Sequence, residues 1–265
     1  MLLAAAPDAG SGALVLGPEA KGPARRVVTA APSLTELVLA LGASERLVGV
    51  SRFDEAPEVK DVQRIGGFND PSIEAVAALK PDLAIVQKAP TNQKPIEALS
   101  RLGVRVLALP LTTVADVEDA CIQVGRELGL EEKGRALAAS LEQTRSEVRA
   151  RAAKRKPVRV LLVVGFQPLV VAGPGSYVDE LLRDVGAVNL AQKAPSAFPT
   201  YSAERAVKLA PDVIIDAANV PEGREKLKAM LPKAKWVQVP SFSLLHPGPA
   251  LGKGLLELEK LVRID

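Results

Sequence analysis

The 265-residue chain is poor in the residues that build metal sites and disulfides, with one cysteine and one histidine. A single cysteine excludes an internal disulfide framework and a multi-cysteine zinc site. A single histidine excludes a histidine-rich metal site. Long apolar runs are also missing, because Gln167 and Pro168 interrupt the longest one, over residues 160–172. It falls short of the ~18 consecutive apolar residues that a membrane-spanning helix needs, so we predict no integral membrane protein.

A large charge of either sign is absent as well. The 34 basic and 31 acidic residues leave a net charge of +3, which does not argue for a nucleic-acid partner. Hydrophobic residues at 48% and charged residues at 25% are typical of a globular protein of one large or two modest domains. Met1–Ala6 is apolar, but it is too short for a complete signal peptide. This segment leaves open whether the protein is cytosolic or its signal peptide has been removed.

Apolar strands alternate with short helical segments along the chain. Strands are predicted over residues 26–30, 47–50, 82–86, 104–109, 159–164, 213–215 and 236–239. Helices are predicted over residues 32–41, 72–79, 94–102, 176–185, 202–209, 224–230 and 249–262. Ser33 and Glu36 have the spacing of a capping box in the first helix. The alternation predicts parallel α/β units.

Two longer helices are predicted in the middle of the chain. Residues 113–128 are amphipathic and place Cys121 on the apolar face, which predicts a buried structural thiol. Residues 131–156 form the longest helical stretch; about 24 residues of helix at ~1.5 Å per residue would span ~36 Å and join two lobes as a rigid rod. We therefore predict an N-terminal lobe over residues 1–130, a connecting helix over 131–156 and a C-terminal lobe over 157–265.

The second half of the chain repeats the first. Ser72–Val86 aligns with Ser202–Asp216 at an offset of 130 residues, and Phe68 and Phe198 share this offset. The repeat predicts that the two halves are versions of one α/β lobe.

The few aromatic residues occupy one kind of position. All five Phe residues are predicted in loops that follow a strand or precede a helix: Phe53, Phe68, Phe166, Phe198 and Phe242. Tyr201 lies beside Phe198. Open α/β sheets bind ligands at the carboxyl ends of their strands, and pockets favour domain interfaces. The pattern predicts a cleft between two lobes that is lined by Phe rings; the alternative is that each ring fills a local core.

Four segments together resemble the cobalamin and ferric-siderophore class of periplasmic substrate-binding proteins: residues 27–36, 47–51 and 73–83, and His246–Pro249. The likeness extends from about Arg25 to the end of the chain. It implies an α/β fold of class III type, with two Rossmann-like lobes joined by a single long rigid helix. It also implies that the protein serves an ABC importer, in the periplasm or anchored at the cell surface.

The resemblance also assigns residue roles. The family's ligand contacts come from facing loops, and the matching positions here are Phe53, Phe68, Phe166, Phe198, Tyr201 and Phe242. In the family one glutamate of each lobe docks onto arginines of the membrane permease, and Glu74 and Glu204 match these positions. The implied function is capture of cobalamin or a related corrinoid by a monomer, with no bond made or broken. We expect no catalytic residue, no bound metal and no cofactor.

Departures from the family pattern keep other ligands open. Cobalamin binders often have Trp or Tyr where this chain has Phe68 and Phe198, and haem binders often have a Tyr ligand near Phe68. Siderophore binders offer Arg or Lys, a role for which Arg52, Lys88 and His246 are the candidates. A ferric-siderophore or haem binder is therefore the alternative. A distant alternative is an α/β nucleotide-binding enzyme, in which the residue 173–176 turn would cradle a phosphate.

Overall fold

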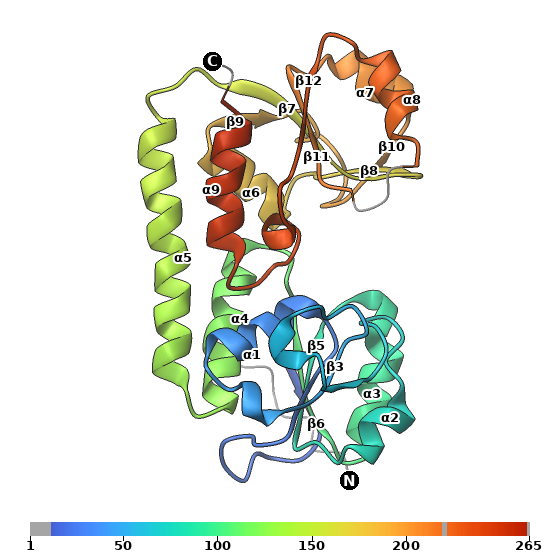
Figure 1. Cartoon of the computed structure of the whole chain (residues 1–265), viewed down its shortest axis with the longest axis vertical. Helices are drawn as coiled ribbons and strands as arrows, with labels where there is room; N and C mark the ends of the chain where they lie inside the picture. The colour runs from blue at the N-terminus through green and yellow to red at the C-terminus, as the bar shows by residue number, and fades with distance from the viewer. Residues whose placement is uncertain (1–11, 219–221, 264–265) are drawn as a thin grey trace. The chain divides into compact units, whose positions relative to one another are not determined.

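The computed structural model describes residues 12–218 and 222–263 and has an α/β fold with two sheets (Figure 1). The chain divides into two compact units. Unit 1 runs to Leu111 and includes Ala115–Ser140, and unit 2 consists of Thr112–Val114 and the chain from Leu141 onward.

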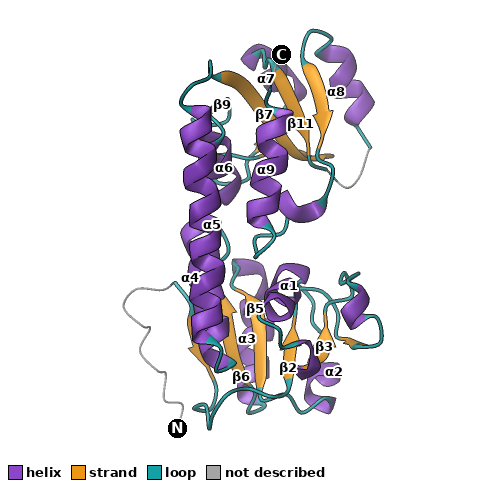
Figure 2. Ribbon diagram, turned by 60° about the vertical axis from the view of Figure 1, so that its left-hand side comes forward, coloured by secondary structure: helices purple, strands orange, loops and turns teal. Residues whose placement is uncertain are grey.

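Unit 1 contains a six-stranded sheet in the order β1-β6-β5-β2-β3-β4. Its strands are β1 (Leu14–Leu16), β2 (Val27–Thr29), β3 (Leu47–Val50), β4 (Gln63–Arg64), β5 (Leu83–Gln87) and β6 (Arg105–Leu109). All neighbours are parallel except β1, which pairs antiparallel with β6 at one edge. Figure 2 shows β5, β2 and β3 side by side. The parallel strands that the sequence predicts in this half are confirmed, and β1 and β4 are additional.

Both faces of this sheet are buried, as a parallel sheet requires. Val28, Ala84 and Val106 point to one face and join a core with Val76 of α2 and Ile96 of α3. The alternate residues of the same strands are equally buried: Val27, Leu83, Ile85 and Leu107. The helices of this unit are α1 (Pro32–Ala40), α2 (Ile73–Ala78), α3 (Gln93–Arg101) and α4 (Val114–Glu127), and the 3-10 turns are η1 (Ser44–Arg46), η2 (Pro57–Val59) and η3 (Pro90–Asn92).

Unit 2 contains a sheet in the order β10-β8-β7-β11-β12, with β9 also paired to β7. Its strands are β7 (Val158–Phe166), β8 (Leu169–Val171), β9 (Ala187–Asn189), β10 (Thr200–Tyr201), β11 (Val213–Asp216) and β12 (Lys235–Gln238). β9, β7, β11 and β12 are parallel, whereas β8 turns back against β7 and β10 pairs antiparallel with β8. Four helices and one 3-10 turn accompany them: α6 (Tyr177–Asp184), α7 (Ala203–Leu209), α8 (Arg224–Met230), α9 (Leu251–Leu261) and η4 (Phe242–Leu244).

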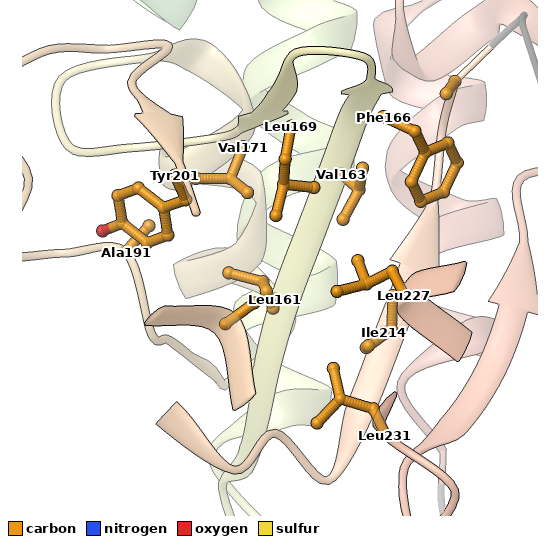
Figure 3. Packing of buried hydrophobic residues seen from close by; sticks show 12 residues of the cluster. Leu161, Val163, Phe166, Leu169, Val171, Ala191, Tyr201, Ile214, Leu227 and Leu231 are labelled. Atoms are coloured by element: carbon orange, nitrogen blue, oxygen red, sulfur yellow. The ribbon is translucent and has the colours of Figure 1, made fainter. Parts of the chain in front are cut away.

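The β7–β8 hairpin was not expected, and it corrects the predicted position of one aromatic residue. Phe166 is the last residue of β7 and not a loop residue. Phe166 is 7% exposed and belongs to the unit 2 core, beside Val163 and at the opposite side of the cluster from Tyr201 (Figure 3). Gln167 and Pro168, which interrupt the apolar run over residues 160–172, form the turn between the two strands of this hairpin.

The predicted long helix is present as α5 (Glu131–Ala152), four residues shorter than expected at its C-terminal end. The boundary between the two units falls inside α5, between Ser140 and Leu141. Cys121 of α4 is buried as predicted, and desolvation raises the pKa of its thiol to about 12. A thiol with such a pKa stays protonated and unreactive at neutral pH.

The internal repeat extends to the details of the backbone. Ser72 and Ser202 cap α2 and α7, and each hydroxyl accepts the backbone N–H three residues later at 3.2 Å. Lys80 and Ala210, again 130 residues apart, have φ angles of 47° and 46°. A positive φ is uncommon outside glycine, so its recurrence shows that the two units share one local structure here.

The predicted capping box in α1 is wrong. The helix begins with Ala31 as its N-cap and Pro32 in the first turn, and no side chain caps it. Proline suits this position because its missing N–H is one that the first turn leaves unpaired.

Candidate functional site

Three neighbouring loops meet at the carboxyl edge of the unit 1 sheet. The loop after β3 holds Phe53 and the loop after β4 holds Phe68, and the Arg52 N–H joins them by donating to the Gly66 carbonyl at 2.8 Å. Asn92, after β5, donates its side-chain amide to the Phe68 carbonyl at 3.2 Å. Parallel strands 47–50 and 63–64 end side by side, and their backbone bonds therefore hold the two aromatic loops together.

Phe53 is the most exposed ring of this edge, with 55% of its surface accessible, whereas Phe68 is half-buried. The Arg52 guanidinium lies over the Phe53 ring, 4.9 Å from its centroid. The same guanidinium forms an ion pair with Asp70 at 2.9 Å. Gly67 is necessary at this point, because a Cβ there would lie 2.9 Å from the Phe53 ring and 2.7 Å from the Asp70 carboxylate. The result is a ring platform flanked by a guanidinium and a carboxylate.

Asp54, directly after Phe53, is buried beneath the same loop. Its N–H donates to the Ser51 carbonyl at 3.1 Å, and its carbonyl accepts from Arg64 at 3.1 Å. Burial raises the pKa of the Asp54 carboxyl to about 6, and the negative charge of nearby Glu36 raises it further. Hydrogen bonds from Thr35 and from the Ser51 backbone lower this pKa, as does the positive charge of Arg64. Asp54 therefore titrates close to neutral pH.

Asp54→Asn is expected to change how stability depends on pH. An acid whose folded pKa is raised holds its proton more tightly in the folded protein, so wild-type stability falls as the pH rises from about 4 to about 6. The variant lacks this loss. The free energy of unfolding is measured in urea for both proteins. The value for the variant minus that for wild type should increase by about 2 kcal/mol from about pH 4 to pH 7. Asp61→Asn, at an exposed site, is the control, and an equal difference at both pH values for Asp54→Asn would contradict the prediction.

Unit 2 brings two further aromatic loops together. Phe198, 41% exposed, lies in the loop between β9 and β10, and its ring centroid is 6.5 Å from that of Tyr177. Tyr177 donates its hydroxyl to the Leu245 carbonyl at 3.1 Å, in the loop after β12. In that segment Phe242, 49% exposed, begins the 3-10 turn η4 and does not lie in a loop as predicted; its ring stacks on His246 with centroids 5.7 Å apart. Tyr177 therefore holds the Phe198 and Phe242 segments together from a buried position.

Tyr177 was not among the predicted site residues. The sequence feature that could have indicated it is its position: Tyr177 follows the capping residue Ser176 and is the first residue of the helix after β8. Ser176 is buried, donates to the Gly173 carbonyl at 2.8 Å and accepts from the Asp179 N–H at 3.1 Å. The 173–176 turn thus uses its hydroxyl internally, which does not favour a phosphate cradle.

Two of the predicted ligand residues point into the core of unit 2. Phe166 stacks on Trp236 with ring centroids 6.5 Å apart, and Arg224 lies 5.7 Å from the Phe166 centroid. Tyr201, in β10, is 5% exposed, and the Arg205 guanidinium covers it at 3.9 Å. The structure therefore does not group these two rings with the exposed ones.

Comparison with known proteins identifies the family. A family model described as periplasmic binding protein matches residues 27–238. The chain belongs to the periplasmic binding protein family. Vitamin B12-binding protein of Salmonella typhimurium is 28% identical to this binding protein over 200 residues, which cover 75% of this chain and 74% of that one.

Solved structures confirm the class III periplasmic binding protein fold expected from the sequence. A periplasmic heme binding protein from Pseudomonas aeruginosa is 28% identical and superposes with a TM-score of 0.79, covering 90% of this chain and 92% of that one. The periplasmic vitamin B12 binding protein of Vibrio cholerae, at 23% identity, superposes with a TM-score of 0.76 over 91% of this chain and 97% of that one. These relatives are named for what they bind and not for a reaction.

In this binding protein, Glu74 and Glu204 occupy equivalent exposed positions in the first turns of α2 and α7. Backbone and Ser202 hydrogen bonds lower the pKa of Glu204, and the charges of Lys226 and Lys208 act in the same direction. Glu204 is therefore ionised at neutral pH.

Residues 12–218 and 222–263 lack both a membrane-crossing helix and a metal-binding group of side chains. No helix there has both the length and the apolar character that crossing a membrane requires. No group of three or more His, Cys, Asp or Glu side chains in that part of the chain is arranged to hold a metal ion.

Proposed function

We propose that this periplasmic binding protein captures cobalamin or a related corrinoid and delivers it to the membrane permease of an ABC importer. The observation that carries the proposal is the set of large apolar rings left exposed on the loops of both units: Phe53, Phe198 and Phe242. A ring exposed on a loop gains free energy when it buries its area on an apolar ligand. The vitamin B12-binding relatives support a corrinoid as that partner.

The chemistry of a corrinoid suits these loops. Its macrocycle presents broad apolar surface, which a Phe ring covers, and its rim carries amide side chains that need hydrogen-bond partners. Burying a large apolar side chain contributes about 1.5–3 kcal/mol, so a few rings and a few polar groups suffice for micromolar or tighter binding. In this proposal Phe68, half-buried beside Phe53, also contributes to the ligand surface.

Haem is the second candidate, because one relative of similar identity is a heme binding protein. Iron ligation in these loops would fall to His246, since Tyr177 and Tyr201 are buried. We place haem second because His246 already stacks on Phe242, and because the sequence has Phe68 where haem binders of this class often have tyrosine.

Calorimetric titration tests the assignment, with cyanocobalamin, hemin and a ferric hydroxamate siderophore in parallel. The proposal predicts saturable one-to-one binding of cyanocobalamin and a ligand-dependent rise in melting temperature. Binding of hemin with a Soret shift that His246→Ala removes, and no response to cyanocobalamin, would move the assignment to haem. ATP and NAD are titrated as further samples, and a response to either of them alone would favour the nucleotide-binding alternative.

A further inference from the structure

We infer that the Arg52–Asp70 ion pair beside Phe53 recognises a carboxamide on the rim of the ligand and discriminates against a carboxylate at the same place. This inference rests on the proposed function, and it assigns a specificity role to a pair of side chains. The two residues are 18 positions apart in the sequence and meet only because their loops follow the adjacent strands β3 and β4.

The geometry leaves hydrogen-bonding capacity on both partners. A single nitrogen of Arg52, Nη2, donates to both carboxylate oxygens of Asp70, at 3.1 and 2.9 Å. The structure gives Nε and Nη1 of Arg52 no partner among residues 12–218 and 222–263, and each Asp70 oxygen keeps a free lone pair. About half of each side chain is exposed. The pair therefore offers donors and acceptors next to each other at the edge of the Phe53 ring.

A primary carboxamide matches this arrangement from both sides. Its oxygen accepts from the guanidinium and its NH₂ donates to the carboxylate. A carboxylate can only accept hydrogen bonds. It therefore accepts from Arg52, but it is repelled by the negative charge of Asp70 and has no proton to donate to that side chain. Like charges brought together at a binding surface are a common source of specificity.

Two other cations near this edge of the sheet are held by backbone carbonyls. Lys88 donates its ammonium to the Gly12 carbonyl at 2.8 Å. Arg64 donates to the backbone carbonyls of Val59, Val62 and Asp54 at 2.8–3.2 Å. Arg52 is thus the cation in contact with Phe53, and Asp70 is the residue that balances its charge.

The test uses two ligands that differ by one charge. Mild acid hydrolysis converts one propionamide of cyanocobalamin into a carboxylate, and the separated monocarboxylates keep the same corrin. Titration at about pH 7.5, where these carboxylates are ionised, gives the affinity ratio of amide to acid for each isomer. We expect wild type to prefer the amide for at least one isomer.

The two variants of the pair should move this ratio in opposite directions. Asp70→Asn leaves Arg52 uncompensated, so the preference for the amide should fall by about fivefold, the size typical of an exposed ion pair. Arg52→Gln leaves Asp70 alone, so the preference should rise. Asp61→Asn makes the same charge change at an exposed site before β4, away from the carboxyl edge, and should leave the ratio unchanged.

The outcomes separate this inference from the proposed function. Ratios that are equal in wild type, Asp70→Asn and Arg52→Gln, with normal cyanocobalamin binding, would overturn the inference alone. A wild-type preference for every acid would also overturn it. Failure of wild type to bind cyanocobalamin at all would overturn the proposed function, and the inference with it. Because only the ratio is compared, a general loss of affinity in a variant does not imitate the effect.

Discussion

Replacing Glu74 and Glu204 together with glutamine should abolish delivery of the ligand while leaving its capture intact. Both side chains are exposed in the first turns of α2 and α7, in contexts that repeat from one unit to the other. We propose that they dock onto arginines of the permease. Losing one partner of a close interfacial charge pair costs about 2–5 kcal/mol, so uptake of radiolabelled cyanocobalamin by cells with the cognate permease should fall about 100-fold or more.

The control for this experiment changes charge without touching the proposed docking positions. Glu58→Gln with Glu147→Gln also removes one exposed glutamate from each unit. It should leave uptake near wild type, and calorimetry should give all three proteins the same Kd. Normal uptake by the Glu74→Gln, Glu204→Gln protein would refute docking by these residues and leave the helix dipole as their only role.

Phe53→Ala with Phe198→Ala should weaken cyanocobalamin binding by about 100-fold. About half of each ring is accessible, so each can bury part of its area on the ligand and contribute about 1.4 kcal/mol, a factor of ten in Kd. Because the rings are exposed before binding, the melting temperature of the free protein should change little.

The matched control removes exposed apolar side chains elsewhere. Leu102 and Met230 precede β6 and β12, at the amino ends of strands, and are exposed to a similar degree. Leu102→Ala with Met230→Ala should keep the wild-type Kd in the same titration. An unchanged Kd in the Phe53→Ala, Phe198→Ala protein would rule out the exposed rings as the ligand surface.

Local patterns in the sequence predicted most of the secondary structure. Serine followed by a short apolar helix, at Ser72 and Ser202, marked two capped helices whose position depends only on neighbouring residues. The 130-residue offset predicted two related α/β lobes, and the matching φ angles of Lys80 and Ala210 agree with it. Strands of buried parallel sheets are apolar on both faces, so they were visible as continuous runs.

The sequence did not predict which aromatic residues are buried and which are exposed. Phe166 and Phe242 both follow apolar runs, yet Phe166 is buried in the unit 2 core and Phe242 is exposed. The difference arises because β8 folds back along β7 and extends that strand to Phe166, whereas β12 ends four residues before Phe242. Strand pairing of this kind depends on partners that no local pattern specifies.

The sequence alone was sufficient for the α/β class, the two related lobes, the buried thiol of Cys121 and the family, because each depends on spacing within a short segment or on an internal repeat. Only the folded chain decided which rings face solvent, that Tyr177 holds two loops together, and that Arg52 meets Asp70 beside Phe53. These contacts join residues that different strands bring to one edge of a sheet, and it is strand order and register that place them there.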